Sequence, residues 1–130
     1  DEDHNKRIER HKKDRGLEWS TIEEDKYISK HNLQGQTVLI DCVTLWLTNF
    51  FYDHQQNIEK CLEEVKTEIN AIIKQDAEII IVSNELGMGS HPDNMMQMKF
   101  IDLQGWTNQY IVGLAEEVYL MVSGIPQKIK

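Results

Sequence analysis

The sequence predicts an α/β domain of three layers, in which helices cover both faces of a mostly parallel sheet. Two observations predict this fold class. Patterns typical of helices separate three short runs that are nearly continuous in aliphatic and β-branched residues: 37–42, 78–83 and 117–123. Such runs are typical of strands buried on both faces. The chain has 130 residues, enough for one hydrophobic core, so we expect residues 1–130 to form a single domain.

The clearest helical pattern is an apolar stripe with steps of four and three residues. It consists of Ile58, Leu62, Val65, Ile69 and Ile72. Charged residues lie between these positions, as expected for a helix with one face on the core. A second stripe runs over about residues 94–116, where Gly105 and Gly113 weaken the pattern and allow a break.

Two further segments are expected to be helical. Residues 45–52 are apolar enough for one or two turns of buried helix. Residues 3–14 predict a charged helix whose main apolar contact is Ile8. The stretch 30–36, which leads into the first strand, is expected to be the loosest part of the chain.

Composition and charge exclude several classes of protein. The formal net charge is −8, which disfavours nucleic-acid binding because phosphate contacts dominate that affinity. No apolar run approaches the length of a membrane span, and no signal peptide is visible at the start. Cys42 and Cys61 have no partner at metal-ligand spacing, which favours a reduced, cytoplasmic protein.

The basic side chains gather near the start of the sequence. Residues 1–15 hold six of the fourteen: Lys6, Arg7, Arg10, Lys12, Lys13 and Arg15. A local cluster of this kind could hold a small phosphorylated ligand. The alternative is a solvated helix face of mixed charge, which composition alone favours.

Polar residues follow each predicted strand. Asp41 ends the first, Asn84 and Glu85 follow the second, and residues 123–124 follow the third. Ligands of open α/β sheets bind beyond the carboxyl ends of the strands, so these residues predict a cleft at one edge. Gly87 and Gly89 would let the backbone approach a ligand or adopt positive φ. The alternative is a tight strand-to-helix turn without a ligand.

Several stretches together resemble one family, the bifunctional adenosylcobinamide kinase/adenosylcobinamide-phosphate guanylyltransferase of cobalamin biosynthesis. They extend along the whole chain: RIERHKKDR at 7–15, WSTIE at 19–23, LIDCVTLWLTN at 39–49, VSNELGMGSHP at 82–92, DLQGWTNQ at 102–109 and EEVYLMVSGIPQKIK at 116–130. The resemblance implies a P-loop NTPase (RecA-like) type of fold. It also implies two reactions: phosphorylation of adenosylcobinamide, and transfer of GMP from GTP to adenosylcobinamide phosphate through a GMP–histidine intermediate.

The resemblance also implies site residues. His11 matches the histidine that becomes guanylylated, and a neutral imidazole is a good nucleophile near pH 7. The matching nucleotide site consists of Lys12, Lys13, Asp14, Arg15, Glu23 and Asp41. Apart from the resemblance, the position of Asp41 at the end of an apolar strand is typical of a carboxylate that binds Mg²⁺. The alternative is that Asp41 is the N-cap of a helix.

The chain departs from the family pattern in three places. Ile101 and Trp106 stand where the family often has basic residues. The phosphate-loop pattern G-x-x-x-x-G-K-[ST] occurs nowhere in the sequence. We therefore expect a carboxyl-terminal portion that lacks the first βα unit of the fold and binds GTP poorly by itself.

The expected ligands are GTP, ATP, Mg²⁺, adenosylcobinamide and adenosylcobinamide phosphate, and the expected assembly is a homo-oligomer, a trimer by resemblance. One alternative is a catalytically silent module that packs against copies of itself or a partner. Its supporting residues would be the apolar candidates for an exposed surface: Phe50, Phe51, Met95, Met96, Met98 and Trp106. Another alternative is a different P-loop-type kinase.

Overall fold

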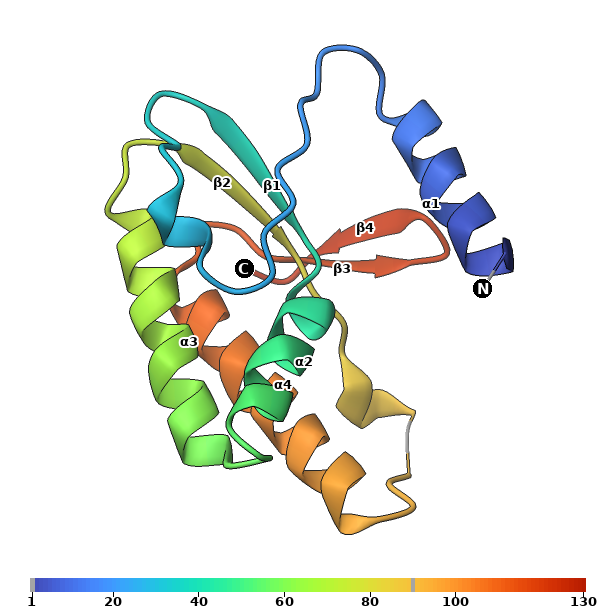
Figure 1. Cartoon of the computed structure of the whole chain (residues 1–130), viewed down its shortest axis with the longest axis vertical. Helices are drawn as coiled ribbons and strands as arrows, with labels where there is room; N and C mark the ends of the chain where they lie inside the picture. The colour runs from blue at the N-terminus through green and yellow to red at the C-terminus, as the bar shows by residue number, and fades with distance from the viewer. Residues whose placement is uncertain (1, 90) are drawn as a thin grey trace.

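The computed structural model describes residues 2–89 and 91–130 and has an α/β architecture (Figure 1). Its α-helices are α1 Glu2–Asp14, α2 Val43–Asp53, α3 Ile58–Ile73 and α4 Met95–Leu114. Its strands are β1 Thr37–Asp41, β2 Glu78–Val82, β3 Tyr119–Val122 and β4 Ile125–Lys128. Two short 3₁₀ helices are η1 Ile28–Lys30 and η2 Leu86–Met88. The α/β class and all four predicted helices are confirmed.

Strands β1 and β2 form a parallel pair, joined by a crossover that contains α2 and α3. Side chains alternate between the two faces of this sheet. Ile40 packs inward and is 8% exposed, whereas Leu39 and Ile80 on the other face are each 44% exposed. In the described part of the chain, helices therefore cover one face of the sheet, where the sequence predicted cover on both.

The third predicted strand does not join this sheet. β3 pairs with β4 as an antiparallel hairpin, in a separate sheet of two strands. Ser123 and Gly124 both have positive φ, 51° and 77°, which suits the tight hairpin turn that sends the chain straight back. The prediction that all three strands lie side by side was wrong, because this local turn pairs the third strand with its own neighbour. The sequence did not predict β4, because Pro126 lies inside it and proline argues against a strand.

The hydrophobic core lies where α2, α3 and α4 meet. Phe50, Val65 and Leu103, one from each helix, are completely shielded from solvent. Phe50 and Phe51 are buried in this core, so their suggested place on an exposed surface was wrong. Asn57 and Asn94 cap the starts of α3 and α4 with their side chains. Neither glycine of α4 breaks that helix, which runs for 20 residues.

Helix α1 and the chain after it lie outside this core. No residue of α1 is buried, and the expected apolar contact, Ile8, is 38% exposed. Gly16, just after the helix, has a φ of 77°, which suits a residue that ends a helix. Figure 1 shows α1 apart from the layer formed by α2, α3 and α4. Among residues 2–89 and 91–130, no helix is both long and apolar enough to span a membrane.

The stretch 30–36 is more firmly held than its sequence suggested. Leu33 is buried, and its backbone N–H donates to Gln75 Oε1 at 2.7 Å. The N–H of Gly35 donates to the carbonyl of Asp76 at 2.6 Å. These contacts fasten the start of β1 to the loop before β2, so both strands enter the sheet at the same level.

Candidate functional site

Polar residues gather at the carboxyl edge of the parallel sheet, as predicted. Asp41 is paired in register with Val82, so both strands end at the same level. Thr44 lies in the first turn of α2, and Ser83 and Asn84 follow β2 directly. This places side chains from two parts of the chain, about 40 residues apart, next to one another.

Five side chains form a hydrogen-bonded cluster at this edge, here called the strand-end network. Asn84 Nδ2 donates to Thr44 Oγ1 at 2.8 Å, and Thr44 Oγ1 donates to Gln104 Oε1 at 2.7 Å. Gln104 Nε2 donates to Ser83 Oγ at 2.9 Å and to Asn108 Oδ1 at 3.0 Å. Asn108 Nδ2 donates to the carbonyl of Asn84 at 2.9 Å. The network fixes the chain after β2 against α2 and α4.

Sequence reasoning found Asn84 but missed Thr44, Gln104 and Asn108. Gln104 is 1% exposed and sits beside Leu103 on the buried side of α4. A buried amide needs hydrogen-bond partners, so a glutamine next to the apolar stripe was the signal that could have revealed the network.

Glu85, the other residue expected to face a cleft, caps a turn instead. Its side chain accepts from the N–H of Gly87 at 3.3 Å, at the start of η2. Neither Gly87 nor Gly89 has positive φ, and a Cβ at Gly89 would meet nothing within 4 Å. Neither glycine therefore takes the positive φ that the sequence allowed, while a close approach of this backbone to a ligand stays a prediction.

A cleft of about 460 Å³ opens beside β1 and ends at the start of α2. It is here called the strand-end cleft. One wall is the chain between α1 and β1, and the other is β1 with the first turns of α2. Its acidic lining residues are Glu18, Glu24, Asp25 and Asp41. Asp41 is exposed at the end of its strand, so its carboxylate is available to a ligand in the cleft.

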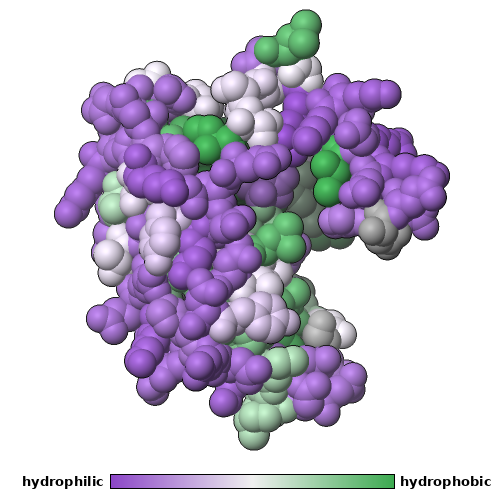
Figure 2. All heavy atoms as spheres, in the orientation of Figure 1, coloured by the Kyte–Doolittle hydropathy of each residue, from purple (hydrophilic) through white to green (hydrophobic). Residues whose placement is uncertain are grey.

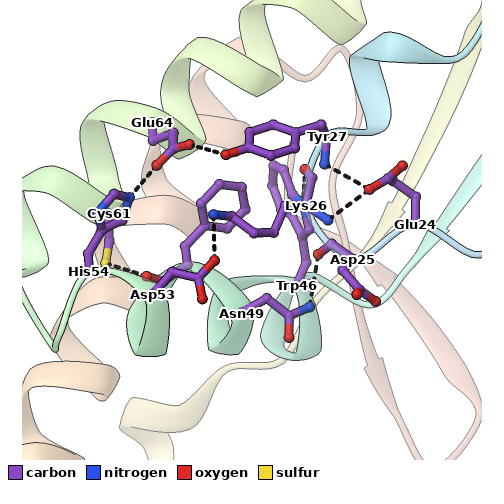
Figure 3. A network of polar contacts seen from close by, with 11 residues as sticks. Glu24, Asp25, Lys26, Tyr27, Trp46, Asn49, Asp53, His54, Cys61 and Glu64 are labelled. Carbon is purple, nitrogen blue, oxygen red and sulfur yellow. Dashed lines mark hydrogen bonds and ion pairs between the residues drawn. The ribbon is translucent and has the colours of Figure 1, made fainter.

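Contacts with α2 hold the outer wall of this cleft in place (Figure 3). Lys26 Nζ pairs with Asp53 at 2.7 Å, and this ion pair raises the pKa of the lysine. Trp46 Nε1 donates to the carbonyl of Lys26 at 2.7 Å, and Asn49 Nδ2 donates to the carbonyl of Asp25 at 2.8 Å. The wall is thus anchored through its backbone as well as through a charged side chain.

Further contacts anchor the wall to α3. Tyr27 donates its hydroxyl to Glu64 at 2.8 Å, and His54 contacts the other oxygen of the same carboxylate. His54, followed by Tyr27, lowers the pKa of Glu64. Glu68 is buried and accepts from Ser29 twice, from the N–H at 3.0 Å and from the hydroxyl at 2.7 Å. The wall therefore belongs to the same packed unit as the helices.

Glu24 is the most strongly perturbed acid of the cleft. The Lys30 ammonium, 2.9 Å from its carboxylate, and then His31 lower its pKa from 4.5 to about 2. The backbone N–H groups of Lys26 and Tyr27 donate to it as well. The carboxylate is therefore ionised over the whole neutral range.

This shift predicts how stability depends on pH. The depressed pKa of Glu24 contributes stability that is complete above about pH 4.5 and is lost as the pH falls toward 2. We expect Glu24→Gln to make the free energy of unfolding depend less on pH within this window. Urea unfolding at several pH values measures this pH dependence. Glu23→Gln is the control, because Glu23 is an exposed neighbour that takes part in none of the ion pairs of the described residues. An unchanged pH slope in Glu24→Gln would contradict the prediction.

The structure does not bring the predicted nucleophile to the cleft. His11, Lys12, Lys13 and Asp14 lie exposed at the end of α1 and are not among the residues that line the cleft. Arg15 Nη1 donates to Thr21 Oγ1 at 3.0 Å, which ties the end of α1 to the cleft wall.

Glu23 is exposed and stands next to Glu24, outside the residues that line the cleft. Of the residues proposed for the nucleotide, Asp41 alone lines the cleft within the described part of the chain.

Asp41 offers one exposed carboxylate at this edge of the sheet. Within residues 2–89 and 91–130, no three His, Cys, Asp or Glu side chains could together hold a metal. Mg²⁺ commonly needs one or two carboxylates, the rest of its shell being water and phosphate oxygens. The exposed carboxylate of Asp41 meets this requirement.

Comparisons with known proteins match nearly the whole chain. Residues 1–129 match the family described as cobinamide kinase / cobinamide phosphate guanyltransferase. The bifunctional adenosylcobalamin biosynthesis protein CobU of Escherichia coli is 34% identical, over 95% of this chain and 77% of that protein. The protein of that name from Salmonella typhimurium is 33% identical over the same shares. Protein CobP of Pseudomonas aeruginosa is 32% identical, over 96% of this chain and 73% of its own.

Proposed function

The chain belongs to the cobinamide kinase / cobinamide phosphate guanyltransferase family, and from this premise we propose that it carries out both reactions in cobalamin biosynthesis. It would phosphorylate adenosylcobinamide and then transfer GMP from GTP to adenosylcobinamide phosphate. The chain spans about three quarters of the length of the relatives it matches. Both activities are therefore proposed for the complete gene product, with residues 1–130 as one α/β domain of P-loop NTPase type.

The observation that carries this proposal is the exposed carboxylate of Asp41 at the carboxyl edge of parallel strands, beside a cleft large enough for a small ligand. This edge is where nucleotides bind in open α/β sheets. With Mg²⁺ bound there through Asp41, the ion would offset the negative charge of the phosphates. The strand-end network would keep the chain after β2 rigid while the ligand binds.

The proposed guanylyl transfer has two displacements, and His11 performs the first. A ring nitrogen of His11 attacks the α-phosphorus of GTP, a P–N bond forms, and the bond to the β-phosphate oxygen breaks as pyrophosphate leaves. A phosphate oxygen of adenosylcobinamide phosphate then attacks the same phosphorus, and the P–N bond breaks. Lys12, Lys13 and Arg15 would stabilise the charge on the phosphates during both steps.

This mechanism requires α1 to move toward the cleft. No residue of α1 is buried, so its departure from the present position disrupts no part of the core. Gly16, with its φ of 77°, separates α1 from the anchored wall and is the natural hinge. Asp14 and Glu23, on either side of this hinge, would contact the nucleotide once α1 has closed.

The proposal is tested by following the mass of the corrinoid. The complete gene product, given adenosylcobinamide and ATP or GTP with Mg²⁺, should produce the phosphorylated compound. GTP should then give the product that carries GMP. A control reaction without the corrinoid separates these products from nucleotide hydrolysis. Failure of the folded protein to modify the corrinoid with either nucleotide would refute the proposed function.

Two expectations stay predictions. The homo-oligomer, expected as a trimer, rests on the family resemblance, whereas the cytoplasmic location rests on Cys42 and Cys61, which have no partner at metal-ligand spacing. The choice between ATP and GTP as phosphoryl donor is left to the assay above.

A further inference from the structure

A second cavity, of about 500 Å³, lies between α2 and the first turns of α4, and this one is mainly apolar. Its size is within the range of small-molecule sites. Most of its lining comes from Thr48, Phe51, Tyr52, Met96, Phe100 and Ile101. Figure 2 shows a few hydrophobic side chains among mostly hydrophilic ones on the face of the molecule that is viewed there. We call this second cavity the α2–α4 cavity.

The α2–α4 cavity adjoins the strand-end network. Thr48 lies one helical turn beyond Thr44 on α2, and its hydroxyl donates to the Thr44 carbonyl at 2.9 Å. Phe100 lies one turn before Gln104 on α4. One turn of helix rises about 5.4 Å, so a ligand longer than this could occupy the cavity and reach the strand ends at once.

The lining favours a large ligand with an apolar surface. Phe51 is 3% exposed and forms an edge-to-face pair with Phe100, with ring centroids 5.4 Å apart. Tyr52 and Met96 stand at the opening, 63% and 39% exposed. The described residues that line the cavity include no Asp, Glu, Lys or Arg. A triphosphate would thus find no lysine or arginine here, whereas a flat apolar surface would find aromatic rings and an adaptable methionine.

The polar members of the lining are hydrogen-bonding groups at its edge. Gln97 and His91 line the cavity together with the apolar residues. An amide and an imidazole can both bond to carboxamides. Ile101, which stands where the family often has a basic residue, here adds to the apolar lining.

We infer that the α2–α4 cavity binds the corrin macrocycle of cobinamide, with the aminopropanol arm directed toward the strand-end network. This inference rests on the proposed function. A corrin is a broad ring system with methyl groups and carboxamide chains around it, and its chemistry matches an aromatic floor with an amide and an imidazole at the edge. The arm carries the hydroxyl that accepts the phosphoryl group, and an arm directed along α2 would bring that hydroxyl toward Thr44 and Asn84 at the strand ends.

The test uses two methionines of α4. Met96→Glu introduces a carboxylate at the opening of the cavity, and desolvating that charge against the macrocycle is costly. Met98→Glu makes the same substitution on the same helix at a side chain that is 46% exposed and does not line the cavity. Cobinamide is the probe, and its binding to the complete gene product is measured by equilibrium dialysis with visible absorbance. Circular dichroism checks that both variants are folded.

We expect Met96→Glu to weaken cobinamide binding by about tenfold or more, because the charge must lose water against the ring, and Met98→Glu to bind like the wild type. Tyr52→Ser, at an exposed position, should also weaken binding. If the wild type and all three variants bind cobinamide equally, the assignment of the α2–α4 cavity as the binding site is wrong, and the proposed function stands. If the wild type binds no cobinamide at all, the proposed function fails, and this inference fails with it.

A second copy of the chain could cover the cavity instead. Light scattering of the same variants measures their molecular mass in solution and so tests whether a second copy covers the cavity. A change of molecular mass in Met96→Glu with unaltered cobinamide binding would overturn the inference in favour of a contact between copies.

Discussion

The His11→Asn variant should take up no GMP from radiolabelled GTP, whereas the wild type should acquire a label that is acid-labile and alkali-stable. A phosphorus–nitrogen bond to a histidine has this pattern of stability, and asparagine has no nucleophilic ring nitrogen with which to form it. We expect the guanylyl transfer rate to fall on the order of 10³-fold or more, since loss of a covalent nucleophile leaves only binding and electrostatic contributions. Phosphorylation should be affected less, because it needs no covalent histidine.

His4→Asn is the matched control for this experiment. His4 and His11 both lie on α1 and are both exposed, so the two substitutions change the same helix in the same chemical way. His4→Asn should keep the full label. A wild-type level of label in His11→Asn would contradict the assignment. So would a label mapped by mass spectrometry to His4, His31, His54 or His91.

The sequence predicted the helices well and the position of α1 poorly. The stripes of α3 and α4 are periodic, and their members Val65, Ile69 and Leu103 are buried as expected. The place of α1 depends on contacts with other parts of the protein, and none of its residues is buried. Periodicity reports which face of a helix is apolar, and α1 has too few apolar residues for such a face to fix its position.

The errors at the strands and in the site have a common physical origin. A hairpin contact joins residues close in sequence and is therefore favoured over a distant pairing for β3. Ser123 looked like the end of a buried strand, although it belongs to the turn of that hairpin. The bond between Thr44 and Gln104 joins residues 60 positions apart. A single sequence carries no local pattern for such a pair, so the strand-end network appeared only in the structure.

The Asp41→Asn variant should lose most of its nucleotide-dependent turnover while it keeps its fold. Asp41 is exposed at the end of β1 and lines the strand-end cleft, so its carboxylate is available to a metal ion that carries the nucleotide. Asparagine keeps the shape of the side chain but loses its charge. Loss of one electrostatic partner of a reacting phosphate typically costs about 10²- to 10³-fold in rate. The free energy of unfolding should change by no more than about 0.5 kcal/mol, as at other exposed positions.

Asp76→Asn provides the matched control, because Asp76 is also exposed but precedes β2, at the opposite end of the sheet. The nucleotide-dependent turnover rate of Asp76→Asn should equal that of the wild type. A magnesium titration distinguishes a metal contact from a general loss of activity: Asp41→Asn should need more Mg²⁺ for half-maximal rate, and Asp76→Asn should not. Thermal unfolding of both variants checks the fold. If Asp41→Asn matches the wild type across the titration, Asp41 does not belong to the magnesium site, and the carboxyl edge of the sheet needs another metal ligand.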